Sequence, residues 1–182
     1  MTPKVLYLSL GSNQGNRLQY LVDAIQLLEK EKVGKVFRYS SVYESESWGF
    51  EGLPFYNICV GVHYTKSLQS ILIRLQYIEH TLNRIRHATN STHPYHDRTI
   101  DIDILLTLDT AHQVLDTERL QLPHPRMHLR KFVLQPLYEI APQLIHPVLQ
   151  KDIQVLLEEC QDTGEIHCLR GYDLERLVIN NY

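Results

Sequence analysis

Cysteine is scarce in this chain of 182 residues, and Cys59, Cys160 and Cys168 form no C-x-x-C pair. An odd number without that spacing argues against a disulfide framework. No apolar run approaches the ~20 residues that cross a bilayer, and the segment Met1-Thr-Pro-Lys4 has no signal-peptide pattern. We therefore expect a soluble cytoplasmic protein with reduced thiols.

An excess of positive charge is also missing, since 18 Lys and Arg face 21 Asp and Glu, for a net charge of −3. This balance offers no general attraction to nucleic acid. The arginines are nevertheless concentrated, because residues 84 to 130 hold six of them and no lysine: Arg84, Arg86, Arg98, Arg119, Arg126 and Arg130. Arginine pairs with phosphate oxygens in a bidentate way that lysine cannot. This local exclusion of lysine favours a polyphosphate site over scattered surface arginines.

Hydrophobic periodicity predicts alternating strands and helices in a single domain, 1–182, a length that one core can serve. Strands are predicted at 4–10, 36–43 and 55–64 and from Arg98 onward, with helices at about 17–32 and 67–85. The order is βαββαβ, which is the ferredoxin-like α+β arrangement with helices on one face of an antiparallel sheet. From about Asp109 we expect a hairpin and helices around 130–140 and 152–160.

The strand from Arg98 carries two carboxylates on one face. Successive side chains of a strand point to opposite faces, so Asp101 and Asp103 project together while the isoleucines between and beside them enter the core. Their spacing is roughly 6–7 Å, which suits one or two hard cations. Mg²⁺ is the natural candidate, since it binds through one or two carboxylates plus substrate phosphates. The alternative is the polar outer face of an edge strand.

A polar stripe on the second predicted helix points toward the same region. Its members fall at i, i+3, i+7 and i+10 and are Gln76, Glu79, Asn83 and Arg86. A solvated helix face would also explain the stripe. No G-x-x-x-x-G-K-[ST] motif occurs, which excludes a P-loop, and we assign Gly11-Ser-Asn-Gln-Gly15 to a structural turn.

Five motifs, in order along the predicted elements, carry a resemblance to a known family. They are Leu10-Gly-Ser-Asn13, Ser40-Ser-Val-Tyr43, Phe55-Tyr-Asn57, Arg98-Thr-Ile-Asp-Ile-Asp103, and Leu122-Pro-His-Pro-Arg-Met127 followed by Arg130-Lys-Phe132. Together they resemble the 6-hydroxymethyl-7,8-dihydropterin pyrophosphokinases, ferredoxin-like enzymes that transfer pyrophosphate from ATP to a pterin alcohol in folate biosynthesis. The match runs from about residue 7 to 147, which leaves 148–182 as an extension.

The resemblance implies an ATP site with two Mg²⁺ ions on Asp101 and Asp103. Catalysis would involve these carboxylates together with Arg84 and Arg98. The remaining nucleotide-binding residues implied are Gln76, Glu79, Arg86, Arg119, His124 and Arg130. Catalysis of this kind rests on positioning and electrostatics, without a protein nucleophile.

The resemblance also implies a pterin site. Phe55 and Phe132 match the family's stacking pair, and Asn57 matches the residue whose amide binds the pterin edge. Further edge contacts are expected from the segment that holds Ser45, Glu46 and Trp48. Without the resemblance, both phenylalanines would be interpreted as core residues.

Some segments depart from the family pattern. The loop 44–49 lacks the usual prolines, and the expected lid 87–97 is longer than in compact relatives and presents Tyr95 where tryptophan is frequent. In the tail, Cys160, His167 and Cys168 lack a convincing spacing for zinc.

Two other function classes remain open. A nucleotidyltransferase with the same metal pair would release pyrophosphate, and a ferredoxin-like RNA-binding module would need exposed sheet aromatics and a basic face. The expected partners are small molecules, not nucleic acid or membrane, and the protein is expected to be a monomer or homodimer.

Overall fold

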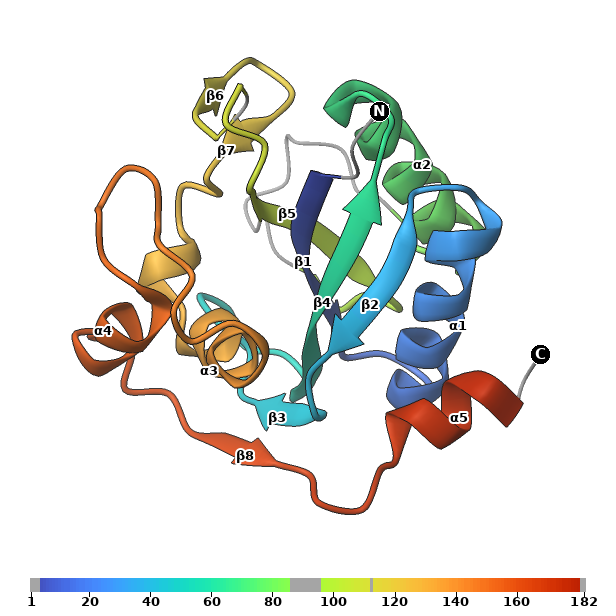
Figure 1. Ribbon diagram of the computed structural model, residues 1–182. Coiled ribbons are helices and arrows are strands. Elements are labelled where there is room, and N and C mark those ends of the chain that lie inside the picture. The colour runs from blue at the N-terminus through green and yellow to red at the C-terminus, as the bar shows by residue number, and fades with distance from the viewer. Residues whose placement is uncertain (1–3, 86–95, 112, 181–182) are drawn as a thin grey trace.

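The computed structural model describes residues 4–85, 96–111 and 113–180, and its elements follow the predicted βαββαβ order. The main sheet consists of β1 (Lys4–Ser12), β2 (Lys35–Tyr39), β3 (Tyr43–Ser45), β4 (Phe55–Tyr64), β5 (Asp101–Thr107) and β8 (Ile166–Cys168). Its order is β5-β1-β4-β3-β8 with β2 also on β4, and every pairing is antiparallel. Helices α1 (Arg17–Lys30) and α2 (Leu68–Thr81) lie on one side of it (Figure 1). The predicted ferredoxin-like fold is confirmed.

The C-terminal part adds a second helical layer. The elements of the C-terminal part are the hairpin β6 (Leu115–Asp116) and β7 (Gln121–Leu122), the 3₁₀ turn η1 (Met127–Leu129), α3 (Lys131–Ile140), α4 (Ile153–Glu158) and α5 (Leu174–Asn180), which packs against α1. Helices α3 and α4 lie on the sheet side opposite α1 and α2 (Figure 1). The expected hairpin and helices are confirmed, whereas β8 and α5 carry no clear period in so few residues and were not predicted.

Strand alternation divides the core between these layers. Leu8 and Ile104 pack in the cluster that faces α1 and α2, whereas Tyr7 and Leu105 pack with Val133 of α3. The predicted isoleucine face of β5 is therefore confirmed. Its other face, which begins with Asp101, opens toward the α3 side of the sheet.

Helix α2 ends earlier than predicted, and the reason lies in its C-cap. Asn83 has φ +63°, its N–H donates to His80 O at 3.0 Å, and the Arg84 N–H donates to Glu79 O at 2.9 Å. These two bonds form a Schellman motif. Ile85, the last residue of the apolar stripe on the predicted helix, is 75% exposed, because the helix ends before it and Arg84 turns toward Asp101 of β5.

We expect Asn83→Ala to lower the free energy of unfolding by about 1 kcal/mol, because alanine is strained at positive φ. Asn83→Gly should match or exceed the parent, since glycine adopts this conformation readily. Urea denaturation of the three proteins is the measurement. Equal stability of the alanine and glycine variants would contradict a left-handed cap at this position.

The strand predicted at 36–43 is interrupted in the structure. The hydroxyl of Ser40 accepts the N–H of Cys59 at 3.0 Å, so a side chain replaces a backbone carbonyl in the ladder. The next amide, from Ser41, donates to the carboxylate of Glu139 on α3 at 3.0 Å. Because of these contacts, β2 ends at Tyr39 and β3 begins at Tyr43 as a separate strand.

His146 is a buried neutral base between α3 and α4. Its Nδ1 accepts the Leu149 N–H at 3.1 Å, and its ring lies 6.0 Å from that of His128, centroid to centroid. Burial, followed by the charge of His128, lowers the pKa of His146 to about 4.

Because the unfolded chain takes up this proton first as the pH falls, stability should decrease by about 2 kcal/mol between about pH 7 and about pH 5. Asparagine at this position keeps an acceptor but does not titrate, so His146→Asn should flatten that dependence. Urea denaturation at both pH values is the measurement. Parallel pH profiles of variant and parent would count against a depressed pKa.

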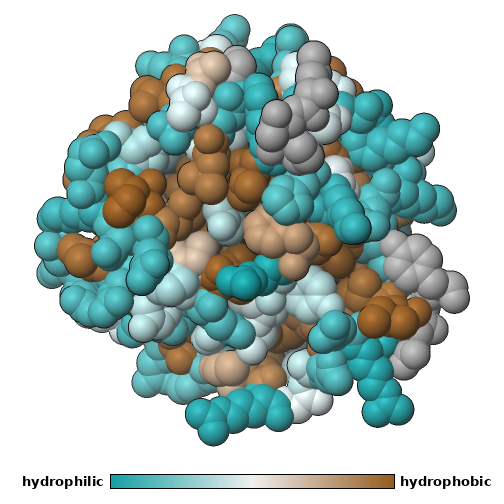
Figure 2. Space-filling model, viewed as in Figure 1, coloured by the Kyte–Doolittle hydropathy of each residue, from teal (hydrophilic) through white to brown (hydrophobic). Residues whose placement is uncertain are grey.

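Hydrophilic side chains cover most of the face seen in Figure 2, and hydrophobic ones appear among them as separate patches. Within the ranges that the structure describes, no helix has the length and apolar character needed to cross a membrane.

Candidate active site

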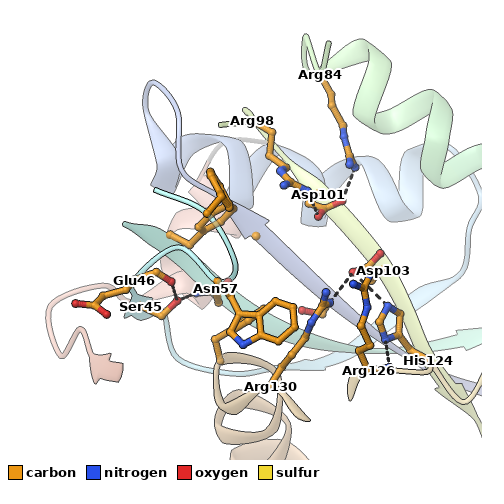
Figure 3. Close-up of a pocket in the computed structure, with 16 residues that line it drawn as sticks. Ser45, Glu46, Asn57, Arg84, Arg98, Asp101, Asp103, His124, Arg126 and Arg130 are labelled. Carbon is orange, nitrogen blue, oxygen red and sulfur yellow. Dashed lines mark hydrogen bonds and ion pairs between the residues drawn. The ribbon is translucent and has the colours of Figure 1, made fainter. Parts of the chain in front are cut away.

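A cavity of about 300 Å³ lies at one end of the sheet, where β1, β4 and β5 meet the segment after β3 and the start of α3. Most of the predicted site residues line it: Ser45, Glu46, Trp48, Phe55, Asn57, Arg84, Arg98, Asp101, Asp103, His124, Arg130 and Phe132. Figure 3 shows the charged groups gathered around β5 and the polar groups Ser45, Glu46 and Asn57 at the other end. The cavity therefore has two chemically different ends.

Asp101 lies between two arginines at the charged end (Figure 3). Arg98 Nη1 lies 2.7 Å from Asp101 Oδ2, and Arg84 Nη1 contacts Oδ1. Burial would raise the pKa of Asp101, but the two guanidinium groups outweigh it and hold this pKa below its usual value. Asp101 is therefore ionised and fixes both arginines at the cavity wall.

Glu79 supports Arg84 from behind. Its carboxylate is buried, pairs with Arg84, and accepts a hydrogen bond from the Ile102 N–H at 2.9 Å. That N–H is on the open side of β5, which is an edge strand of the sheet. Burial would lower the pKa of Arg84, but Asp101 and Glu79 raise it. The structure thus places Glu79 as a support for Arg84, outside the lining of the cavity.

Asp103 is held more loosely than Asp101. Its Oδ2 lies 3.9 Å from both Arg130 Nη1 and His124 Nε2, and its side chain is 40% exposed. Loss of hydration inside the cavity is the largest cause that raises the pKa of Asp103 to about 7, and the charge of Asp101 is the second. Arg130 opposes this shift. A carboxylate with this weak pairing can accept a cation.

The two aspartates fit a hard cation, since both present oxygens on the same face of β5. Among the described residues, no group of three or more His, Cys, Asp or Glu is placed to hold a metal. An ion at this carboxylate pair would take its remaining ligands from substrate phosphates and water, as Mg²⁺ commonly does.

His124 is a neutral hydrogen-bonding group in the wall. Burial, followed by Arg130 and Arg126, lowers its pKa to about 4. Its Nδ1 accepts the Arg126 N–H at 3.2 Å, so the proton of the neutral ring resides on Nε2. That N–H faces Asp103 and the cavity.

Aromatic rings and one amide form the other end. Phe55 and Asn57 are on β4, two residues apart, and Asn57 Nδ2 donates to Ser45 Oγ at 3.0 Å. The guanidinium carbon of Arg130 lies 4.8 Å from the Trp48 ring centroid and 5.6 Å from that of Phe132. This end can hold a flat, polar-edged ring.

Four lining residues were missed as site residues: Ser9, Gly11, Phe50 and Arg126. A signal existed for Ser9 and Gly11, because β1 alternation puts them opposite its leucines. Gly11 has a steric reason, since a Cβ there would lie 3.2 Å from Asn57 Oδ1 and 3.5 Å from Phe55.

The sequence predicts only a structural turn at Asn13, but the structure shows that this residue positions Arg98. Its Oδ1 accepts the Arg98 N–H at 2.8 Å, while its Nδ2 donates to Asp97 at 2.6 Å and to Leu53 O at 3.1 Å. The family motif Leu10-Gly-Ser-Asn13 was the sequence signal that could have identified Asn13 as part of the site. The role of Asn13 depends on partners 40, 84 and 85 residues away along the chain, which a local sequence pattern cannot identify.

Other predicted residues lie elsewhere. Gln76 is exposed on α2, and Arg119 is exposed on the β6–β7 hairpin, where it lines a second cavity of about 460 Å³ with Leu72 and Leu120. Arg86 and most of the expected lid 87–97, Tyr95 included, lie outside the described residues.

Comparison with known proteins matches residues 7–142 to the family described as 7,8-dihydro-6-hydroxymethylpterin-pyrophosphokinase. A 2-amino-4-hydroxy-6-hydroxymethyldihydropteridine pyrophosphokinase from Porphyromonas gingivalis is 42% identical over 144 residues, 79% of this chain and 94% of the relative. The enzyme of the same name from Aquifex aeolicus is 36% identical over 150 residues, 82% of this chain and 88% of the relative.

A solved structure of HPPK-DHPS from Plasmodium falciparum superimposes with a TM-score of 0.66 at 17% identity, which supports the fold. The match covers 87% of this chain and only 43% of that longer one. On the family match and the identity to full-length relatives, the chain belongs to the 7,8-dihydro-6-hydroxymethylpterin-pyrophosphokinase family.

Proposed function

We propose that this protein transfers pyrophosphate from ATP to the hydroxymethyl group of 6-hydroxymethyl-7,8-dihydropterin, with release of AMP, in folate biosynthesis. The observation that carries the proposal is the division of one cavity into a charged end and an aromatic end. A polyphosphate and a flat heterocycle require these two environments. The family relationship supports the same pairing of substrates.

In the proposed reaction, the hydroxymethyl oxygen of the pterin attacks the β-phosphorus of ATP. The bond from that phosphorus to the oxygen bridging it to the α-phosphate breaks, and AMP leaves with the electron pair. The hydroxyl proton passes to solvent. No covalent step on the protein is needed, so positioning and charge stabilisation carry the catalysis.

The charged end would stabilise the phosphates as they develop charge. Arg84 and Arg98 line the cavity and are held there by Asp101, and His124 adds a neutral donor. Asp101 and Asp103 would hold two Mg²⁺ ions, which would neutralise charge on the phosphates when bound.

The aromatic end would orient the pterin. Phe55 and Phe132 offer ring faces, and such stacking combines well with a few polar edge groups. Asn57, which is 2% exposed, would bond the pterin edge together with groups from the segment containing Ser45 and Glu46. The nucleophilic hydroxymethyl group would then point toward the phosphates.

Further contacts with ATP are proposed for residues beyond the described ones that line the cavity. Gln76, Arg86 and Arg119 are proposed as further ATP contacts, made as the chain closes on the nucleotide. We also propose that residues 1–182 act as one domain in the cytoplasm on small-molecule substrates alone, as a monomer or homodimer.

An RNA-binding module is disfavoured, because helices lie against both faces of the sheet where such modules expose aromatics. The nucleotidyltransferase alternative predicts a different product. Phosphorus NMR of the protein with ATP, Mg²⁺ and hydroxymethyldihydropterin should show AMP and a pterin diphosphate. Release of free pyrophosphate with a pterin–AMP conjugate would overturn the proposal, and omission of the pterin controls for simple ATP hydrolysis.

A further inference from the structure

The chain continues beyond the family match along one side of the cavity. The match ends at residue 142. After α4, the chain crosses to β3 as β8 and ends in α5 against α1 (Figure 1). Nothing in the proposed chemistry uses this segment, so its contacts require a separate explanation.

The first contact is at the N-terminus of α3. The N-cap residue Arg130 makes no side-chain cap bond there. Instead Asp162 Oδ2 accepts the Lys131 N–H at 3.0 Å, while its Oδ1 accepts the Gly164 N–H at 3.0 Å. A carboxylate at this position satisfies an otherwise unpaired helix donor and interacts favourably with the helix dipole. Asp162 therefore fixes the turn that carries Phe132.

The second contact is on β3. Strand β8 pairs with β3 so that Ile166 lies opposite Ser45, and the Leu169 N–H donates to Val42 O at 2.9 Å. Ser45 is the residue that accepts the amide of Asn57. The tail thus also holds the strand that supports the polar edge of the slot.

A space of about 150 Å³ separates these two contacts. The segment after β3, with Trp48, bounds it together with Phe132, Asp162 and Ile166. The same Trp48 and Phe132 line the main cavity. The aromatic end has two walls: the start of α3, with Phe132, and β3 with the segment that follows it, from Ser45 to Trp48. One short segment of the tail therefore contacts both walls.

We propose that residues 162–168 brace the pterin slot by fixing the relative position of its two walls, with Asp162 as the positioning residue. This inference rests on the proposed function. A slot that is already ordered binds a flat ring without the entropic cost of ordering its walls. Loss of the brace should weaken pterin binding more than it slows pyrophosphate transfer, because Asp162 bonds the N–H groups of Lys131 and Gly164, whereas the aspartates that face the phosphates are on β5.

Asp162→Ala is expected to raise the Kd and KM for the pterin about fivefold, which corresponds to the loss of an N-cap worth ~1 kcal/mol. Asp162→Asn should recover only part of the affinity, since its single amide oxygen can accept the Lys131 N–H or the Gly164 N–H but not both. Glu158→Ala is the matched control, because Glu158 is an exposed neighbouring acid bonded to Gln154 on its own helix. The sole tryptophan, Trp48, gives a direct readout, and its emission should shift in the alanine variant alone.

Unchanged pterin affinity and Trp48 emission in Asp162→Ala would overturn the brace. Hydrogen exchange on the unaltered protein gives a test that does not depend on a variant folding. Pterin binding should slow exchange of the Lys131 and Leu169 amides, and no slowing would also overturn the proposal. Should the unaltered protein bind no pterin and form no AMP, the proposed function itself fails, which distinguishes the two outcomes.

Discussion

Replacing Asp101 or Asp103 by asparagine is expected to lower kcat by about 10²–10³-fold, the range seen when one preorganised charge-stabilising group is lost. Asparagine keeps the shape of each side chain but removes its charge. Asp103 faces the cavity, and Arg130 Nη1 and the neutral His124 Nε2 both lie 3.9 Å from its Oδ2, so its loss should act on activity with little change in stability. Asp101 pairs with Arg84 and Arg98, so its replacement should also destabilise the fold.

Kinetics across a Mg²⁺ titration, together with urea denaturation, measure both effects. Each variant should need more Mg²⁺ for its residual activity, because a ligand has been weakened. Asp116→Asn is the matched control, since Asp116 lies on the exposed hairpin and bonds Gln121, a contact that asparagine can retain. Parental activity of either cavity variant at ordinary Mg²⁺ concentrations would remove the metal interpretation of the pair.

The pairing of these aspartates could be predicted because it depends on a period of two within one strand. The same reasoning placed Phe55 and Asn57 on one face of β4, and the structure brings both into the cavity. Alternation is imposed by backbone geometry, so it holds wherever a strand forms. Helices have a backbone period of their own, 3.6 residues, so the order of strands and helices, and with it the ferredoxin-like fold, could also be predicted from periodicity.

The unpredicted features depend on hydrogen bonds between distant segments. The end of α2 is decided by Asn83 at positive φ, against a hydrophobic stripe that continues to Ile85. Asn13 reaches Asp97, and Asp162 reaches Lys131, across separations of 84 and 31 residues. Periodicity describes which side of an element is apolar. It carries no information about which remote polar group satisfies a particular donor.

Arg98→Ala and Asn57→Ala are expected to separate the two ends of the cavity. Arg98 pairs with Asp101 at the phosphate end, and its guanidinium carbon lies 5.7 Å from the centroid of the Phe55 ring. Its removal should lower kcat by about 10²–10³-fold and weaken pterin binding by less. Asn57 is buried at the aromatic end. Its removal would leave polar groups of the bound pterin unpaired, at a cost of ~1–3 kcal/mol, which is about 5- to 150-fold in Kd.

Steady-state kinetics and direct pterin titration of both variants decide between separate and shared roles. Arg98→Ala should lose mainly turnover, because an interaction formed only in the transition state changes kcat. Asn57→Ala should lose mainly pterin affinity, because Asn57 would bond the pterin edge in the ground state as well. Arg176→Ala, on the exposed surface of α5, is the matched arginine control. Normal pterin binding by Asn57→Ala combined with full turnover by Arg98→Ala would show that these two residues do not have the assigned roles, even if AMP is the product.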